Sequence, residues 1–91
     1  FRAVVQQQWL PALETFAPQL LLISAGFDAH GADDMSHLWF TTADYAWVTQ
    51  AACGIADRHA QGRIVSTLEG GYDLRSLAAS AAAHIERLVF A

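Results

Sequence analysis

The sequence predicts an α/β fold built on a βαβ unit with flanking helices. Two short apolar runs, at residues 19–24 and 63–68, have the length and composition of buried strands. A helical pattern lies between them at residues 41–59, and two further helical patterns flank them at residues 1–16 and 74–90. Strands that alternate with helices in this order form parallel sheets. The loops that follow the two strands are therefore expected at the same edge of the sheet.

The composition is that of a globular chain and excludes several functional classes. The 91 residues are 54% hydrophobic and 15% charged, with a formal net charge of −4 and no lysine. This balance argues against a nucleic-acid partner, and no apolar run approaches the roughly 18 residues of a membrane span. The single cysteine, Cys53, excludes an internal disulfide. We expect a soluble, cytoplasmic protein, and the initial Phe1 suggests a fragment or a processed product.

The N-terminal segment predicts an amphipathic helix that ends at Ala17–Pro18, before the first strand. Pro11 predicts a kink or a restart of this helix, because proline lacks an N–H and its ring clashes with the preceding turn. The apolar residues at helical spacing, which we expect to be buried, are Val5, Trp9, Leu13 and Phe16.

The other two helices carry recognisable start and stop signals. Thr41 and Asp44 predict a capping box, Gln61–Gly62 a helix stop, and Asp73 an N-cap for the last helix. The residues expected to face inward are Tyr45, Val48, Ala52, Ile55 and His59 in the central helix and Leu77, Ala81, Ile85 and Leu88 in the last helix.

Asp28 follows the first predicted strand, where open α/β sheets place their ligands. From its position alone, it could be a metal ligand, a catalytic acid or base, or a turn residue. His30 lies two positions further on, a spacing that invites a metal interpretation, but no third ligand is evident nearby. A surface role in the loop is therefore favoured for His30, and surface or core roles for His59 and His84.

The turn after the second strand is Gly70–Gly71–Tyr72. Its glycines permit close approach of a ligand to the backbone, although they are equally compatible with an ordinary strand-to-helix turn. The turn lacks the glycine pattern or lysine of common nucleotide-binding loops. Tyr72 could direct its hydroxyl at a developing oxyanion, or it could pack on the sheet.

Two segments together resemble the C-terminal part of the histone deacetylase family. Residues 24–30 (SAGFDAH) and 68–74 (LEGGYDL) match its motifs in order and spacing, and the start of the central helix, from Thr41 or Thr42 to Tyr45, is also similar. The resemblance points to the class II-like bacterial branch, which includes acetylpolyamine amidohydrolases. It implies an arginase-like, three-layer α/β domain with a large parallel sheet. Residues 1–91 would be its C-terminal portion, without the upstream part.

The resemblance also implies roles for five residues. Asp28 matches the last of the family's Asp, His and Asp zinc ligands, and Tyr72 matches the tyrosine that polarises the acetyl carbonyl. Gly70 and Gly71 match glycines that line the substrate tunnel, and Met35 falls at an apolar position of the tunnel wall. The family has Asp-Pro before that position, whereas this chain has Asp33–Asp34. His30 does not correspond to a zinc ligand of the family.

The remaining zinc ligands and the general-base histidines lie upstream in the family and have no match in this chain. The implied substrate is an acetylated amine, either acetyl-lysine or acetylpolyamine, and Zn²⁺ would be bound only by the full domain. The isolated chain is expected to be inactive. Two alternatives remain: a non-catalytic assembly module that pairs its exposed strands with a second copy or a complementing chain, and a phosphate-ligand module that uses the Gly70–Gly71 turn.

Overall fold

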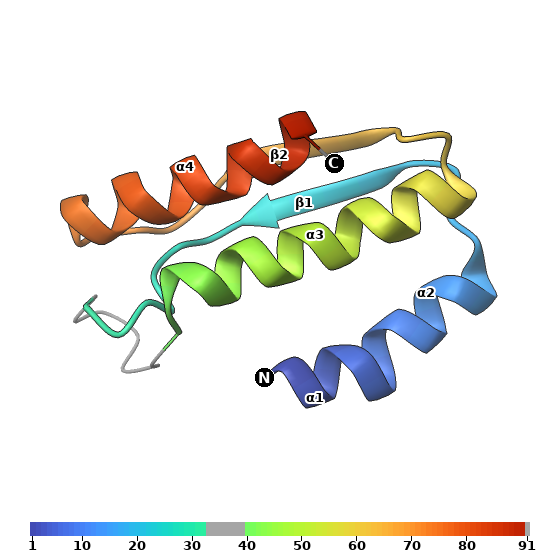
Figure 1. Cartoon of the computed structure of the whole chain (residues 1–91), viewed down its shortest axis with the longest axis horizontal. Coiled ribbons are helices and arrows are strands. Elements are labelled where there is room, and N and C mark those ends of the chain that lie inside the picture. Colours follow the sequence, from blue (N-terminus) through green and yellow to red (C-terminus); the bar gives the residue numbers. More distant parts are fainter. Residues whose placement is uncertain (33–39, 91) are drawn as a thin grey trace.

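The computed structural model describes residues 1–32 and 40–90, and within them the predicted α/β order is confirmed. The described part contains a two-stranded parallel sheet (Figure 1). None of its helices is long and apolar enough to cross a membrane. The elements are α1 (Arg2–Val4), the π-helix η1 (Val5–Trp9), α2 (Leu10–Phe16), β1 (Leu21–Ala25), α3 (Thr42–His59), β2 (Ile64–Leu68) and α4 (Leu74–Phe90).

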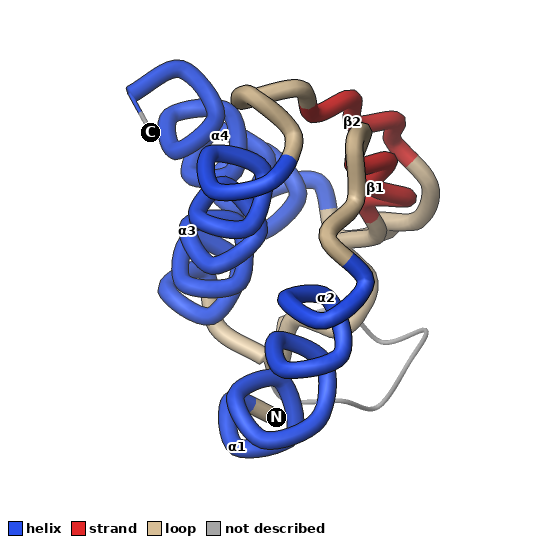
Figure 2. Tube along the Cα trace, turned by 90° about the vertical axis from the view of Figure 1, so that its right-hand side faces the viewer, coloured by secondary structure: helices blue, strands red, loops and turns tan. Residues whose placement is uncertain are grey.

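The sheet is covered on one side only by the described elements. β1 and β2 pair in parallel from Leu21–Ile64 to Ala25–Leu68. Figure 2 shows α3 and α4 on one side of the two strands and no helix on the other. On the uncovered face, Leu22 is 73% exposed and Val65 is 55% exposed. Two apolar strands with one open face do not make a stable parallel sheet by themselves, which agrees with the large parallel sheet that the family resemblance implies.

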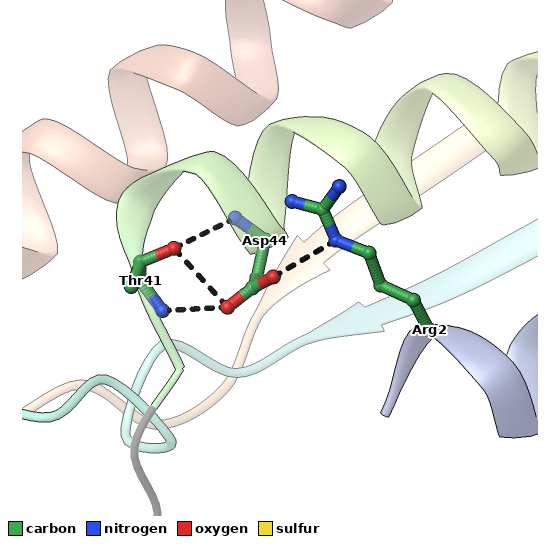
Figure 3. Close-up of polar contacts among 3 residues, drawn as sticks. All are labelled: Arg2, Thr41 and Asp44. Carbon is green, nitrogen blue, oxygen red and sulfur yellow. Dashed lines mark hydrogen bonds and ion pairs between the residues drawn. The ribbon is translucent and has the colours of Figure 1, made fainter.

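The start of α3 is fixed by the predicted capping box (Figure 3). The Thr41 hydroxyl accepts the N–H of Asp44 at 3.2 Å, and Asp44 Oδ2 accepts the N–H of Thr41 at 2.9 Å. Arg2 donates from Nε to Asp44 Oδ1 at 3.0 Å. The hydrogen bond from the Thr41 backbone, followed by that from Arg2, lowers the pKa of Asp44. The capping box fixes the first turn of α3, and the bond from Arg2 joins that turn to α1.

The inner face of α3 agrees with the prediction in part. Tyr45 and Ile55 are buried, whereas Val48, Ala52 and His59 are half-buried. Cys53 is also buried, as expected for a core thiol, and desolvation raises its pKa.

The inner face of α4 differs from the prediction. Ile85 is 56% exposed, whereas Ser76, Ser80 and His84 are buried, one helical turn apart. Leu77, Ala81 and Leu88 are half-buried. The prediction for Ile85 was wrong because the buried stripe of α4 consists of polar side chains, whereas Leu77 and Ala81 pack against the core as predicted.

His84 is a hydrogen-bonded core residue that joins three elements. Its Nδ1 lies 2.7 Å from Thr49 Oγ1 on α3, and its Nε2 lies 2.8 Å from Ser66 Oγ on β2. Since the Thr49 hydroxyl donates to the Tyr45 carbonyl, Nδ1 carries the proton and Nε2 accepts from Ser66. Burial lowers the pKa of His84, which favours this neutral form.

The N-terminal helical run is less buried than its sequence pattern predicts. Val5 is buried, but Trp9 is 52% exposed and Phe16 is 78% exposed, so the predicted buried face is wrong at both aromatic positions.

Helix α2 is joined to α3 through Glu14, which accepts hydrogen bonds from Arg58 and His59. The expected irregularity at Pro11 is present, because the π-helix η1 immediately precedes the turn that holds this proline.

Candidate functional site

Parallel pairing continues beyond the ends of both strands and brings Asp28 to Gly70. The Glu69 N–H donates to the Ala25 carbonyl at 2.9 Å, and the Phe27 N–H donates to the Gly70 carbonyl at 2.7 Å. A Cβ atom placed on Gly70 would lie 3.0 Å from both Cγ and Oδ2 of Asp28. The Asp28 carboxylate therefore lies directly against the Gly70 backbone, as the parallel topology predicts.

A second glycine leaves room for the same carboxylate. A Cβ on Gly26 would lie 3.2 Å from Asp28 Oδ1, closer than ordinary van der Waals contact. Asp28 itself is half-buried. A side chain at either glycine would have to displace the carboxylate, so the two glycines together form a cradle that fits it.

The chain around Asp28 is held on both sides by hydrogen bonds. After Asp28, the Ala29 N–H donates to the Tyr45 hydroxyl at 3.1 Å, and the Ala29 carbonyl accepts the Phe40 N–H at 2.8 Å. Before it, the ring of Phe27 packs on the ring of Tyr45 with centroids 5.0 Å apart. Tyr45 thus contacts both chain neighbours of Asp28.

His30 has a structural role in this loop. Its Nδ1 accepts the Ala32 N–H at 3.0 Å, and its Nε2 lies 3.3 Å from Thr42 Oγ1. Both ring nitrogens are therefore engaged with the loop and with the first turn of α3. This arrangement agrees with the interpretation that His30 is not a metal ligand.

The turn after β2 presents Tyr72 at the same edge of the sheet. Gly71 has a φ of 153°, which is strained for any other residue, and a Cβ there would lie 2.7 Å from Leu77 Cδ1, so the leucine would have to shift. Asp73 then caps α4 by accepting the Ser76 N–H at 2.9 Å, as predicted. Tyr72 lies between Gly71 and Asp73 and is 60% exposed. This exposure does not fit the alternative that Tyr72 packs on the sheet.

The donor set matches one metal ligand and not a complete metal site. A carboxylate in a glycine cradle at a strand end supplies the hard oxygen that Zn²⁺ accepts beside nitrogen ligands. Within residues 1–32 and 40–90, however, no three His, Cys, Asp or Glu side chains are placed to hold one metal ion. Met35, Asp33 and Asp34 lie outside the described residues, so their predicted positions stay predictions.

Sequence reasoning missed two contacts of this site. It placed Tyr45 on the buried face of α3 but did not find that the Tyr45 hydroxyl accepts a hydrogen bond from the Ala29 N–H. It also missed the hydrogen bond from Ser24 Oγ to Glu69 Oε1, at 2.7 Å, which joins the two strand ends. The sequence offered one signal for these contacts. Ser24, Glu69 and Tyr45 all lie close to the loops that meet at this edge of the sheet.

Comparison with known proteins identifies the family. Residues 1–88 match the family model for the histone deacetylase domain. Type-2 histone deacetylase 1 of Dictyostelium discoideum is 41% identical over 76 residues, which are 84% of this chain and 5% of that protein. The histone deacetylase-like amidohydrolase of Pseudomonas aeruginosa is 38% identical over 72 residues, 79% of this chain and 19% of that protein.

The fold comparison agrees with the sequence comparison. The solved structure of the histone deacetylase Clr3, a Schizosaccharomyces pombe protein, superposes with a TM-score of 0.86 at 34% identity. The match covers 97% of this chain and 14% of that one. The chain thus spans only a small part of the relatives that it matches, and the resemblance found in its motifs is confirmed. On both sequence and structure, the chain belongs to the histone deacetylase domain family.

Proposed function

We propose that this chain is the C-terminal portion of a zinc-dependent deacetylase domain. The reaction is hydrolysis of an acetylated amine, acetyl-lysine or acetylpolyamine, to acetate and a free amine. The observation that carries the proposal is the Asp28 carboxylate in its glycine cradle, with Tyr72 on the adjoining turn at the same edge of the sheet. Membership of the histone deacetylase family supports the reaction class.

Asp28 would hold the metal as one of several ligands, with the others supplied from outside this segment. When bound, Zn²⁺ supplies Lewis acidity and lowers the pKa of a coordinated water. The contribution of this chain is geometric. The backbone on both sides of Asp28 is hydrogen-bonded, and the glycines at positions 26 and 70 leave the carboxylate room at the strand end.

Tyr72 would donate a hydrogen bond to the acetyl carbonyl oxygen and stabilise the negative charge that develops there. Its exposure of 60% leaves its side chain accessible from solvent in the described part of the chain. Gly70 and Gly71 would line the substrate channel with backbone, because neither carries a side chain that could block it. Met35 is proposed as an apolar wall of the same channel.

The open face of the sheet bears on the proposed partners. Leu22 and Val65, which pair across the two strands on this face, are 73% and 55% exposed and form an apolar surface that a larger sheet would cover. We propose that the upstream part of the domain covers it, in a cytoplasmic enzyme. The same surface favours one alternative, a non-catalytic module that assembles with a second copy or a complementing chain. The phosphate-ligand alternative is disfavoured because the Asp73 carboxylate already caps the start of α4.

The test compares the purified 91-residue chain with the full-length protein. Metal content and hydrolysis of an acetyl-lysine reporter are measured for both, with light scattering for oligomeric state. We expect bound zinc and chelator-sensitive hydrolysis in the full-length protein, and neither in the 91-residue chain. Metal-dependent hydrolysis by the short chain would contradict the incomplete site. A zinc-free, inactive full-length protein that oligomerises would favour the assembly alternative.

A glycine substitution tests the cradle. Gly70→Ala places a methyl group 3.0 Å from Asp28 Oδ2, so the carboxylate must move. Since a displacement of about 1 Å can reduce catalysis about 100-fold, we expect kcat/KM of the full-length enzyme to fall by about that factor. The matched control is Gly54→Ala, whose Cβ would meet the half-exposed guanidinium of Arg58 at 3.2 Å, away from the Asp28 site. It should raise stability by about 0.5–1 kcal/mol through helix propensity and leave kcat/KM unchanged. Equal kcat/KM in both variants would contradict the cradle.

A further inference from the structure

We propose that Tyr45 is a positioning residue that holds Asp28 in the conformation needed to bind metal. The proposal rests on the proposed function of Asp28 as a zinc ligand. It concerns a residue of α3 that lies outside the strand ends and the glycine turn. Tyr45 would act through the backbone on either side of Asp28, without contacting metal or substrate.

The first argument is the pattern of contacts. The Tyr45 hydroxyl accepts the N–H of Ala29, the residue after Asp28, at 3.1 Å. The Tyr45 ring packs on Phe27, the residue before Asp28, with ring centroids 5.0 Å apart. One side chain therefore restrains both neighbours of the proposed ligand. The Phe27 N–H adds a third restraint through its bond to the Gly70 carbonyl at 2.7 Å.

The second argument is the rigidity of the position from which Tyr45 acts. Tyr45 is 7% exposed and follows the capping box of Thr41 and Asp44 directly. The Tyr45 carbonyl also accepts the Thr49 hydroxyl at 2.7 Å, and Thr49 in turn is bonded to His84 of α4. Because Tyr45 is buried on a capped helical turn, its side chain has little conformational freedom left. Its hydroxyl can therefore hold the loop in one orientation.

A purely structural role predicts a different result when the hydroxyl alone is removed. Tyr45→Phe keeps the ring, and with it the packing on Phe27 and on Phe40, whose centroid lies 6.0 Å away. The hydroxyl that accepts the Ala29 N–H disappears. If Tyr45 serves packing alone, the loop and the metal affinity remain unchanged. If it positions Asp28, both change while the core is retained.

The experiment uses Tyr45→Phe in the full-length protein, with two readouts that do not depend on turnover. We expect the amide of Ala29 to exchange with solvent about 5- to 10-fold faster, as loss of one hydrogen bond implies. We expect the dissociation constant for Zn²⁺, measured by competition with a chelator, to rise about 10-fold or more. The control is Ile55→Val, which trims a fully buried side chain further along α3 that takes no part in holding Tyr45. It should lower the melting temperature without changing either readout.

Two outcomes would overturn the proposal. Unchanged Ala29 exchange and unchanged zinc affinity in Tyr45→Phe would show that the hydroxyl does not position the ligand. Equal losses of zinc affinity in Tyr45→Phe and Ile55→Val would show that general destabilisation is responsible. Failure of the proposed function is recognised separately, because the unmodified full-length protein would then bind no zinc.

Discussion

Replacing Asp28 with asparagine in the full-length enzyme should remove bound zinc and lower kcat/KM by about a thousandfold. Asparagine preserves the size and shape of the side chain, so the cradle of Gly26 and Gly70 still accommodates it. It removes the negative charge that makes the carboxylate a strong ligand for a divalent cation. Loss of a Lewis acid worth several kcal/mol in the transition state corresponds to a rate reduction of this size. Metal analysis of the purified variant and kinetics with an acetylated substrate provide the two measurements.

The matched control for this prediction is Asp57→Asn. Asp57 is an exposed residue of α3, and its substitution makes the same change of charge away from the site. We expect zinc content and kcat/KM of this variant to equal those of the unmodified enzyme. An Asp28→Asn enzyme that keeps its zinc and its activity would leave Asp28 as a turn residue, the simplest of the interpretations that its position allows.

The parts of the fold that were predicted correctly depend on short-range signals. The capping box at Thr41 and Asp44 is present with both reciprocal bonds. The stop at Gln61–Gly62 is present as two left-handed residues, with φ of 54° and 75°. Each of these features is determined by residues within one turn of each other. A local sequence pattern is therefore enough to predict it.

The helix faces were harder to predict because their cause lies in other elements. Hydrophobic periodicity placed Ile85 inward, but the buried stripe of α4 consists of Ser76, Ser80 and His84. Small and polar side chains can occupy a helix interface when partners satisfy their hydrogen bonds, as Thr49 and Ser66 do for His84. Those partners are distant in sequence, so a search for apolar stripes misses them.

The location of the candidate site could be predicted from the sequence. The hydrogen bond that holds the loop carrying Asp28 could not. Parallel strands must open their following loops at one edge, which places Asp28 beside Gly70 without any knowledge of side chains. The bond from Ala29 to the Tyr45 hydroxyl depends on the path of the loop after β1, which no local pattern determines. Roles for Asp28 and Tyr72 came only from family resemblance, and their chemical function stays a prediction.

Tyr72→Phe is the second substitution for which we expect a large effect. The hydroxyl would stabilise negative charge on the carbonyl oxygen in the transition state much more than it stabilises the neutral substrate. Its loss should therefore lower kcat about 100- to 1,000-fold and change KM little. The aromatic ring is retained, so the substitution removes the hydroxyl alone. Steady-state kinetics over a range of substrate concentrations separate kcat from KM.

The chain contains two tyrosines, and removing the same oxygen atom from each distinguishes two kinds of contribution. Tyr72→Phe should keep full zinc affinity and normal exchange at the Ala29 amide, because its hydroxyl would act on the substrate. Tyr45→Phe should weaken zinc binding and loosen Ala29, because its hydroxyl bonds the loop that carries Asp28. If Tyr72→Phe lost zinc while its kcat per bound metal ion stayed normal, Tyr72 would support the metal site rather than the reaction. The two variants therefore assign each tyrosine either to zinc binding or to the reaction itself. The assignment depends on which of the two steps is impaired and not on how much activity is lost.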